Sequence, residues 1–496
     1  MSTLSCSRET TLRAEIDLPL LVDRASSQAL AVQVGDQLRD AMRSGALKEG
    51  ERLPSTRALA GLLGVSRTVV VDAYQQLYAE GWLDGRHGSG TFVASSGDCM
   101  ITQRESPGQE GYHRRTARSR TANPQVGGDA PEVLHDHAKG GEAGVGVVDL
   151  RPGRPWVGAY DVAAWRRAWR SAGDVPPADR RDMRGHLPLR ELLADHLRRT
   201  RAVPTSPANV MVTQGTGHGL DLIAATLVRP GARAGVEEPG WRVARNVLAA
   251  RGAEIVPCPV DDQGVIVEAL PDDLEVLYTT PAHQFPVGGR LPIPRRERLL
   301  AWARRTGALI VEDDYDAEFR YDVGPLPALH GLDPARVVLL GTLSKSLSPD
   351  VGLGWLVAPE PMLDMIARRR HELADSVPGP VQAAVTTLLA KGDLDRHLRR
   401  MRREYARRRA AIVEALGPLV CGDTAGLHVL IELPEHVVPG LVRRAEERGV
   451  LLDTLERHHH GPPRVHGLVL GYGSASLAEV RRGCAVIGEL LSPAGH

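Results

Sequence analysis

Near the amino terminus, apolar residues recur at helical spacing in three short segments. In the first, 30–42, every fourth residue is apolar, which predicts one buried helical face. The second is expected to start after the capping residue Ser55 and to end at Gly64. The third starts after the capping residue Ser66 and spans 67–79. Two short helices joined by a tight, glycine-containing turn predict a helix-turn-helix.

The pattern changes after the third helix. A short apolar strand at 82–83, a glycine-rich turn at 86–90 and a second strand at 91–93 predict a small wing. Because glycine has no Cβ atom, such a turn can approach a phosphate or a groove closely. The helices and the wing together predict a small domain over residues 21–95, which we call the reader domain.

Two further zones follow. Residues 96–145 are rich in Gly, Ser, Arg and Pro and poor in apolar residues, which predicts a flexible linker. The linker's arginine cluster at 114–120 could also steer a phosphate-rich partner. From 146 to 496, apolar runs alternate with amphipathic helical patterns, and this alternation predicts a large α/β domain.

Length and composition agree with this division. At 496 residues the chain is too long for one ordinary domain, and 42% hydrophobic with 25% charged residues is typical of a globular protein. No apolar run reaches about 18 residues and segment 1–13 is polar, so we expect neither a transmembrane helix nor a secretory signal. The five cysteines form no close pairs, which argues against disulfides and zinc and predicts a cytoplasmic location.

The overall charge at first argues against a nucleic-acid partner. Lys plus Arg and Asp plus Glu both number 61, so the net charge is zero. Residues 1–95 alone contain ten Lys or Arg against eleven Asp or Glu, a net charge of −1. We expect the acids of the reader domain, among them Asp36 and Glu80, to lie away from DNA. The placement of a few arginines is therefore more informative than the bulk charge.

The turn around Lys345 carries the clearest chemical signal. An apolar run at 337–340 predicts a buried strand, and the polar turn after it contains this one lysine, with the hydroxyls of Thr342 and Ser344 nearby. Burial lowers the pKa of a lysine, so that its amine can attack an aldehyde. The hydroxyls suit a phosphate.

Other predicted strands end in residues of complementary chemistry. The strand at 308–311 runs into acidic residues that include Asp313, and a carboxylate at the carboxyl end of a strand can meet a ligand in the crevice of an α/β sheet. The strand at 211–213 passes into a helix through Gly215, and the amides of such a helix start bind phosphate. Trp241 places an aromatic face after another turn.

The reader domain resembles the winged helix-turn-helix of GntR-type repressors. The resemblance is carried by Arg-Leu-Pro-Ser-Thr-Arg at 52–57, Leu-Gly-Val-Ser-Arg-Thr at 63–68 and the wing at 81–93. It implies that the third helix enters the major groove of double-stranded DNA and that the wing contacts the minor groove. The residues implied in DNA contact are Arg57, Ser66, Arg67, Thr68, Arg86, His87 and Gly88. The alternative is a winged-helix module that binds another protein.

The large domain resembles fold-type I aminotransferases, which hold pyridoxal 5'-phosphate as a Schiff base with a lysine. The carriers are the segments around Gly215, Trp241, Asp313 and Lys345, in that order. The resemblance implies that Lys345 is the catalytic, Schiff-base lysine and that Asp313 pairs with the pyridinium nitrogen. The other implied contacts are Tyr315, with His283 or Gln284, for the phenolate oxygen, Trp241 for ring stacking, and Gly215, Thr216 and Thr342 for the phosphate.

A winged helix-turn-helix, a linker and an aminotransferase-like domain in this order resemble the MocR subfamily of GntR regulators. The resemblance implies a DNA-binding regulator that binds pyridoxal phosphate and senses an amine, an amino acid or the cofactor itself. It also implies a head-to-tail homodimer and, at most, half of a transamination reaction. Two alternatives remain: a fully active aminotransferase with an attached DNA-binding domain, and a regulator whose sensor no longer binds the cofactor tightly.

Two positions depart from the family pattern. Gly352 occupies the position seven residues after Lys345, where the family usually has an arginine for the cofactor phosphate. The loss of such a charge-assisted contact costs about 1.5–3 kcal/mol. Near the last strands, only Arg464 is a candidate for the arginine that binds a substrate carboxylate. The consecutive histidines at 458–460 cannot all face one ion, so we expect a polar loop there and no metal site.

Overall fold

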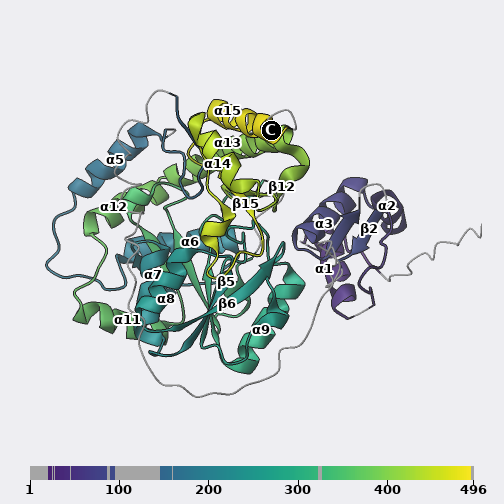
Figure 1. Ribbon diagram of the computed structural model, residues 1–496. Coiled ribbons are helices and arrows are strands. Elements are labelled where there is room, and N and C mark those ends of the chain that lie inside the picture. Colours follow the sequence, from purple (N-terminus) through teal and green to yellow (C-terminus); the bar gives the residue numbers. More distant parts are fainter. Residues whose placement is uncertain are drawn as a thin grey trace, which may run out of the picture.

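The computed structural model describes residues 20–24, 26, 28–44, 46–86, 90–94, 146–158, 160–321 and 327–492. The side chains of residues 79 and 84–86 are not described. The predicted linker, 96–145, lies outside the described residues, so its boundaries stay a prediction. Figure 1 shows the reader domain, in purple, beside the large domain, whose described residues begin at 146.

The described part of the reader domain contains three helices and one hairpin, as the sequence predicts. They are α1 (Leu30–Arg43), α2 (Thr56–Leu63), α3 (Arg67–Ala79), β1 (Leu83–Arg86) and the antiparallel β2 (Gly90–Val93). The predicted caps begin both short helices, because Ser55 and Ser66 accept hydrogen bonds from backbone amides in the first turns of α2 and α3. Gly64 ends α2 with a left-handed φ of +62°. 

The large domain is built on an eight-stranded sheet with the order β4-β11-β10-β9-β8-β5-β6-β7. The strands are mostly parallel, and β11 is antiparallel to both of its neighbours. Their bounds are β4 Val210–Thr213, β5 Arg233–Glu238, β6 Glu254–Asp261, β7 Gly264–Val265, β8 Val276–Thr279, β9 Leu309–Asp313, β10 Val337–Thr342 and β11 Gly354–Val357.

Helices cover both faces of this sheet because its strands are apolar on both sides. Along β10, Val338 and Leu340 pack in a cluster with α7, α8 and α11, whereas Leu339 packs with α6 and α12. The helices are α5 Val162–Gly173, α6 Leu187–Arg201, α7 Thr216–Leu227, α8 Arg242–Ala250, α9 Ile293–Thr306, α10 Leu329–Leu332, α11 Glu360–Glu372 and α12 Gly379–Ala390. This layering brings the carboxyl ends of the parallel strands to one open edge.

A smaller carboxy-terminal lobe packs beside that edge. Its antiparallel sheet has the order β12-β13-β15, and β14 pairs with β3 from the start of the large domain. The elements are α13 Asp393–Leu416, β12 Val420–Cys421, β13 His428–Glu432, α14 Val438–Glu447, β14 Val450–Leu451, β15 Gly467–Gly471, α15 Leu477–Leu491 and β3 Val148–Asp149. Among the described helices, none has both the length and the apolar character needed to cross a bilayer.

Candidate functional site

A cavity of about 480 Å³ opens at the carboxyl ends of the parallel strands. Its walls come from the ends of β8, β9 and β10, from the starts of α7 and α8, and from β13 of the smaller lobe. Cavities of this size are typical of small-molecule sites. The cavity lining includes Lys345, Asp313, Tyr315, Trp241, Gly215, Thr216 and Thr342, so the structure brings seven of the nine sequence-predicted cofactor residues together.

Lys345 lies in the turn after β10 and is half-buried. Its amine donates a hydrogen bond to the backbone oxygen of Gly153 at 2.5 Å. Burial lowers the pKa of this amine, while the nearby carboxylates of Asp316 and Asp313 oppose the shift. A larger neutral fraction makes the amine a better nucleophile toward an aldehyde.

Asp313, the last residue of β9, is buried and only half satisfied. Its Oδ2 atom accepts a hydrogen bond from the hydroxyl of Tyr278 at 2.6 Å. Its Oδ1 atom is buried and has no hydrogen-bond partner among the residues that the structure describes. Burial raises the pKa of Asp313 to about 7, and the hydrogen bond from Tyr278 only partly opposes this. A carboxyl group in this position is ready to pair with a cationic N–H, which is what a protonated pyridine ring offers.

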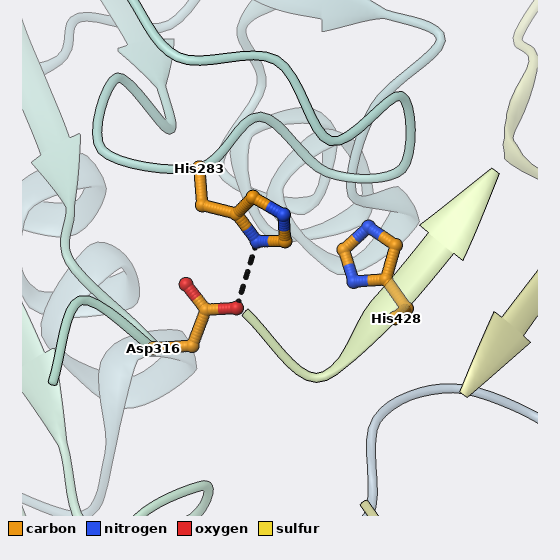
Figure 2. A group of neighbouring side chains, drawn as sticks. All are labelled: His283, Asp316 and His428. Atoms are coloured by element: carbon orange, nitrogen blue, oxygen red, sulfur yellow. Dashed lines mark hydrogen bonds and ion pairs between the residues drawn. The ribbon is translucent and has the colours of Figure 1, made fainter. Parts of the chain in front are cut away.

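Tyr315 on the cavity wall is held by His283, which is itself hydrogen-bonded to Asp316; Figure 2 shows His283 and Asp316. Its hydroxyl donates to the backbone oxygen of His283 at 3.1 Å and lies 3.1 Å from Nδ1 of the same residue. Nδ1 of His283 also lies 2.9 Å from the Asp316 carboxylate. His283 therefore supports Tyr315 and does not itself line the cavity.

His428 completes the group in Figure 2, and its ring lies 4.7 Å from that of His283. The ligand atoms of His283, Asp316 and His428 lie within 4.8 Å of one another, a spacing that could hold a metal ion. Nδ1 of His283 and the Asp316 carboxylate are hydrogen-bonded to each other, whereas the buried Nε2 atoms of His283 and His428 have no hydrogen-bond partner among the described residues. The sequence analysis did not single out Asp316 or His428.

Small residues and hydroxyls shape one end of the cavity. Gly215 caps α7 with φ +92°, and a Cβ atom on it would lie 3.5 Å from Oγ1 of Thr342 and 3.8 Å from Oγ of Ser344. A Cβ atom on Gly354 would lie only 2.7 Å from the Gly215 Cα, so this close approach requires glycine. Thr342 donates to Ser344 at 2.9 Å. The α7 start and these hydroxyls form a cradle suited to a phosphate.

Two aromatic side chains form a neighbouring wall. The rings of Trp241 and Tyr278 stack with centroids 6.0 Å apart. Trp241 directly precedes α8, and the exposed side chain of Arg242 lines the cavity from the first residue of that helix. Arg242 has no hydrogen-bond or ion-pair partner among the described residues.

Gln284 does not reach the cavity. Its amide nitrogen donates to the Glu237 carboxylate at 3.1 Å and to the Pro239 oxygen at 3.0 Å, and its amide oxygen accepts from the Val287 amide at 2.9 Å. Because both ends of the side chain are engaged in the protein interior, the structure places Phe285 on the cavity wall instead.

The DNA-reading residues predicted in the reader domain lie at the start of α3. Ser66, Arg67 and Thr68 are exposed, and Nε of Arg67 donates to Oγ1 of Thr56 at 3.3 Å, which joins the starts of α2 and α3. Arg57 is exposed on the first turn of α2. Arg86 ends β1, but its side chain is not described, and His87 and Gly88 lie outside the described residues.

Two of the acids expected to lie away from DNA are paired within the reader domain, whereas Asp72 is exposed on α3. Glu80 is buried and binds the Arg39 guanidinium at 2.7 Å, and Asp36 pairs with the same arginine. Neither carboxylate is left free to repel a phosphate, even though the reader domain has a net negative charge.

Known proteins match both parts of the chain. The family model described as bacterial regulatory proteins, gntR family, matches residues 30–93, and the model for aminotransferase class I and II matches residues 161–454. The HTH-type pyridoxine biosynthesis transcriptional regulator PdxR of Corynebacterium glutamicum is 35% identical over 482 residues, covering 96% of this chain and 99% of that protein. The chain belongs to the MocR subfamily of GntR-type transcriptional regulators.

Further similarities agree. The probable rhizopine catabolism regulatory protein MocR of Rhizobium meliloti is 33% identical and covers 94% of each chain. An archaeal alanine:glyoxylate aminotransferase superposes with a TM-score of 0.66, 24% identity and coverage of 72% of this chain and 92% of that one. Thermus thermophilus LysN, in a crystal structure with N-(5'-phosphopyridoxyl)-L-leucine, superposes with a TM-score of 0.64 and 24% identity. The match covers 73% of this chain and 95% of that one. The predicted fold class is confirmed, and pyridoxal phosphate is the cofactor of this domain.

In this MocR-type regulator, the other side of the cavity comes from residues that the sequence analysis missed. Arg457 and His458 lie on the wall and both contact the Asp453 carboxylate at 3.1 Å. Arg464, the predicted carboxylate partner, is exposed and does not line the cavity. Of the consecutive histidines, His458 lines the cavity and His459 is buried, so the segment is not simply a polar loop. One signal in the sequence could have indicated these residues. Arg457 and His458 are adjacent, and only Arg464 had been considered for the arginine that binds a substrate carboxylate.

Gly352 adopts a left-handed backbone conformation. It follows a 3₁₀ turn with φ +55°, and no atom lies within 4 Å of the position that a Cβ would take. Position 352 therefore supplies no cation, and Arg242 lines the same cavity as Gly215 and Thr216.

Asp313 predicts a pH dependence of stability in the cofactor-free regulator. A carboxyl group whose pKa is about 7 when folded and about 4 when unfolded holds its proton more tightly in the folded chain. The free energy of unfolding should therefore fall as pH rises through that interval. Replacing the acid by its neutral isostere, Asp313→Asn, should remove this contribution. We expect the melting temperature of the variant, relative to that of the wild type, to increase as the pH rises from about 5 to about 7.5. A constant difference across that range would contradict the assignment.

Proposed function

We propose that this protein is a cytoplasmic transcriptional regulator that responds to pyridoxal phosphate bound in the large domain. The observation that supports it best is the pairing, in one cavity, of the Lys345 amine with the unpartnered Oδ1 of Asp313. These are the two groups that a pyridine aldehyde needs, one at its carbonyl carbon and one at its ring nitrogen. The name of the Corynebacterium relative, a regulator of pyridoxine biosynthesis, agrees with a response to the cofactor itself.

In this proposal each cavity residue has one task. Lys345 forms the covalent link, and Asp313 accepts a hydrogen bond from the ring nitrogen and keeps its positive charge. Tyr315 would turn its single hydroxyl proton from the backbone oxygen of His283 to the ring oxygen, and Trp241 would cover one face of the ring. The cofactor, when bound, supplies an aldehyde and an electron-withdrawing ring. The phosphate contacts are Gly215, Thr216, Thr342 and Ser344.

The lack of an arginine at position 352 gives a physical reason for the cofactor itself to be the molecule that the regulator senses. A phosphate held by amides and hydroxyls, without a bidentate arginine, is bound less tightly by about 1.5–3 kcal/mol. A weaker site exchanges its ligand with the surrounding pool, which a sensor requires and a dedicated enzyme does not. An amine that reacts with the bound cofactor is a second candidate signal, since Arg457 and His458 offer polar contacts beside the ring site.

We expect Arg242 to supply part of the missing charge. Arg242→Ala should weaken pyridoxal phosphate binding about tenfold or more, the equivalent of about 1.4 kcal/mol. Titration of the cofactor-free protein, followed by the absorbance of the bound cofactor, gives the dissociation constant. Arg245→Ala is the matched control, because Arg245 lies on the same helix and does not line the cavity. Equal weakening in both variants would mean that Arg242 has no specific role.

The reader domain is proposed to bind operator DNA through Arg67 and its neighbours, in a head-to-tail homodimer. The test of the proposed function measures two properties of the full chain. The protein should develop the absorbance of a lysine-bound cofactor, and its affinity for DNA from the regulated gene's upstream region should change when the cofactor is added. Absence of the absorbance at saturating cofactor would refute the sensor. Sustained conversion of an amino donor and a keto acceptor would favour an aminotransferase instead.

A further inference from the structure

Three buried side chains of the types that bind transition metals meet beside the cavity: His283, Asp316 and His428. Their exposed fractions are 2%, 1% and 3%. One ligand atom from each lies within 4.8 Å of the other two. Figure 2 shows the His283 ring beside the Asp316 carboxylate, with the His428 ring facing them. Two imidazoles and one carboxylate form a ligand set that proteins use for Zn²⁺ and related divalent ions.

The three side chains come from separate parts of the chain. His283 lies in the segment after β8, Asp316 follows β9, and His428 is the first residue of β13 in the smaller lobe. An ion bound by all three therefore joins the smaller lobe to the large sheet. Because His428 also lines the cavity, the cavity provides a path by which an ion reaches the group.

The spacing of the ligand atoms suits a single ion. In a tetrahedral site with bonds of about 2.1 Å, neighbouring ligand atoms are about 3.4 Å apart. Nδ1 of His283 and the Asp316 carboxylate are closer than this, at 2.9 Å. No two of the three ligand atoms are more than 4.8 Å apart. Small rotations of the side chains therefore bring all three to one ion.

Hydrogen bonds within the protein leave the two imidazole rings incompletely satisfied. Nδ1 of His283 is hydrogen-bonded to Asp316, whereas the buried Nε2 atoms of His283 and His428 have no hydrogen-bond partner among the described residues. A buried polar atom without a partner costs free energy. Each neutral imidazole has one nitrogen with a lone pair, and that lone pair binds a metal ion. The two rings are therefore better suited to an ion than to an apolar core.

The charges around the group do not exclude a cation. Arg201 and Arg320 border a void of about 10 Å³ beside Asp316. Each of these arginines forms an ion pair with a carboxylate of its own, Asp314 for Arg201 and Asp423 for Arg320. In contrast, Asp316 pairs with a histidine of the group, which is charged only when protonated. The Asp316 carboxylate is therefore available to balance part of the charge of an ion.

We propose that His283, Asp316 and His428 bind one divalent transition-metal ion, with Zn²⁺ as the ion that their chemistry fits. The ion takes the place of the proton that His283 and Asp316 share, and this proton is released to solvent. It lies next to Tyr315, whose hydroxyl is 3.1 Å from Nδ1 of His283. The ion ties the smaller lobe to the large sheet, a role that goes beyond the proposed function and does not depend on it.

The test counts zinc bound to the full chain, prepared without an affinity tag, freed of pyridoxal phosphate and treated with a chelator. Wild type and variants are then dialysed against buffered Zn²⁺. Asp316→Asn and His428→Asn each remove one ligand, and Asp316→Asn keeps the size of the side chain and an oxygen that accepts from His283. His460→Asn is the matched control, because His460 is an exposed histidine that does not line the cavity.

We expect about one zinc ion per chain in the wild type and in His460→Asn, and zinc binding weakened at least about tenfold in the two ligand variants. Zinc should also raise the melting temperature of the wild type by several degrees and leave that of a ligand variant unchanged. Because the variants are compared with and without zinc, a variant that is merely less stable is distinguished from one that has lost the ion.

X-ray absorption of the zinc-loaded wild type should show nitrogen and oxygen neighbours at about 2.0–2.1 Å. Sulfur neighbours would mean that cysteines bind the ion, and loss of the ion in His460→Asn would assign it to the consecutive histidines. Either result overturns the proposal. It is also overturned if the wild type binds no zinc, or if both ligand variants keep the ion at wild-type affinity.

Discussion

Lys345→Ala is expected to abolish the absorbance of the lysine-bound cofactor completely. Of the lysines that the structure describes, Lys345 is the one on the cavity wall. Its low pKa, which results from burial, suits covalent attack on an aldehyde, and alanine has no group that can replace the amine. The measurement is a titration of the cofactor-free variant with pyridoxal phosphate.

Lys391→Ala provides the control for this experiment, since Lys391 is exposed at the end of α12 and does not line the cavity. It should titrate like the wild type. Asp313 and Trp241 remain in Lys345→Ala, so residual noncovalent binding, visible as fluorescence quenching, is compatible with the assignment. An unaltered absorbance band in Lys345→Ala would show that the covalent link is made elsewhere.

Arg67→Ala is expected to weaken operator binding about tenfold or more. The residue opens the recognition helix, and one specific arginine contact is worth about 1–3 kcal/mol. Its hydrogen bond to Thr56 keeps the guanidinium at the joint between α2 and α3. Because few arginines make the contact, the salt dependence of binding should be modest.

A gel shift or fluorescence anisotropy with the upstream DNA measures this effect. Gln75→Ala is the matched control, being exposed on the same helix eight residues later. Cofactor absorbance should stay unchanged in both variants, because neither residue lies near the cavity. An unchanged affinity in Arg67→Ala would refute the assignment of α3 as the reading helix.

Local signals in the sequence predicted most of the fold. Helix ends depend on interactions between residues that are close in sequence. The caps Ser55 and Ser66 and the left-handed Gly64 can therefore be recognised without a structure. Lys345 and Asp313 were also predictable, because each lies at the carboxyl end of a predicted strand. The carboxyl ends of parallel strands meet at one edge of the sheet.

Residues whose position depends on distant packing were not predictable. Gln284 looked like a cofactor contact, but the buried Glu237 carboxylate, some fifty residues earlier in the chain, draws its amide inward. His428 and Arg457 reach the cavity only because the smaller lobe packs against the large sheet. The contact of Ile293 with the reader domain was not predictable for a related reason. An apolar residue at a helix start is expected to be buried in its own domain, and here it packs in the core of another.

In the proposed function, pyridoxal phosphate held at Lys345 controls DNA binding by the reader domain. The most direct test measures the affinity of the full chain for its upstream DNA with and without pyridoxal phosphate, in the wild type and in Lys345→Ala. We predict that the cofactor changes the affinity of the wild type and leaves that of Lys345→Ala at its cofactor-free value. Equal responses in the two proteins, or no response in the wild type although its cofactor absorbance is present, would contradict the claim.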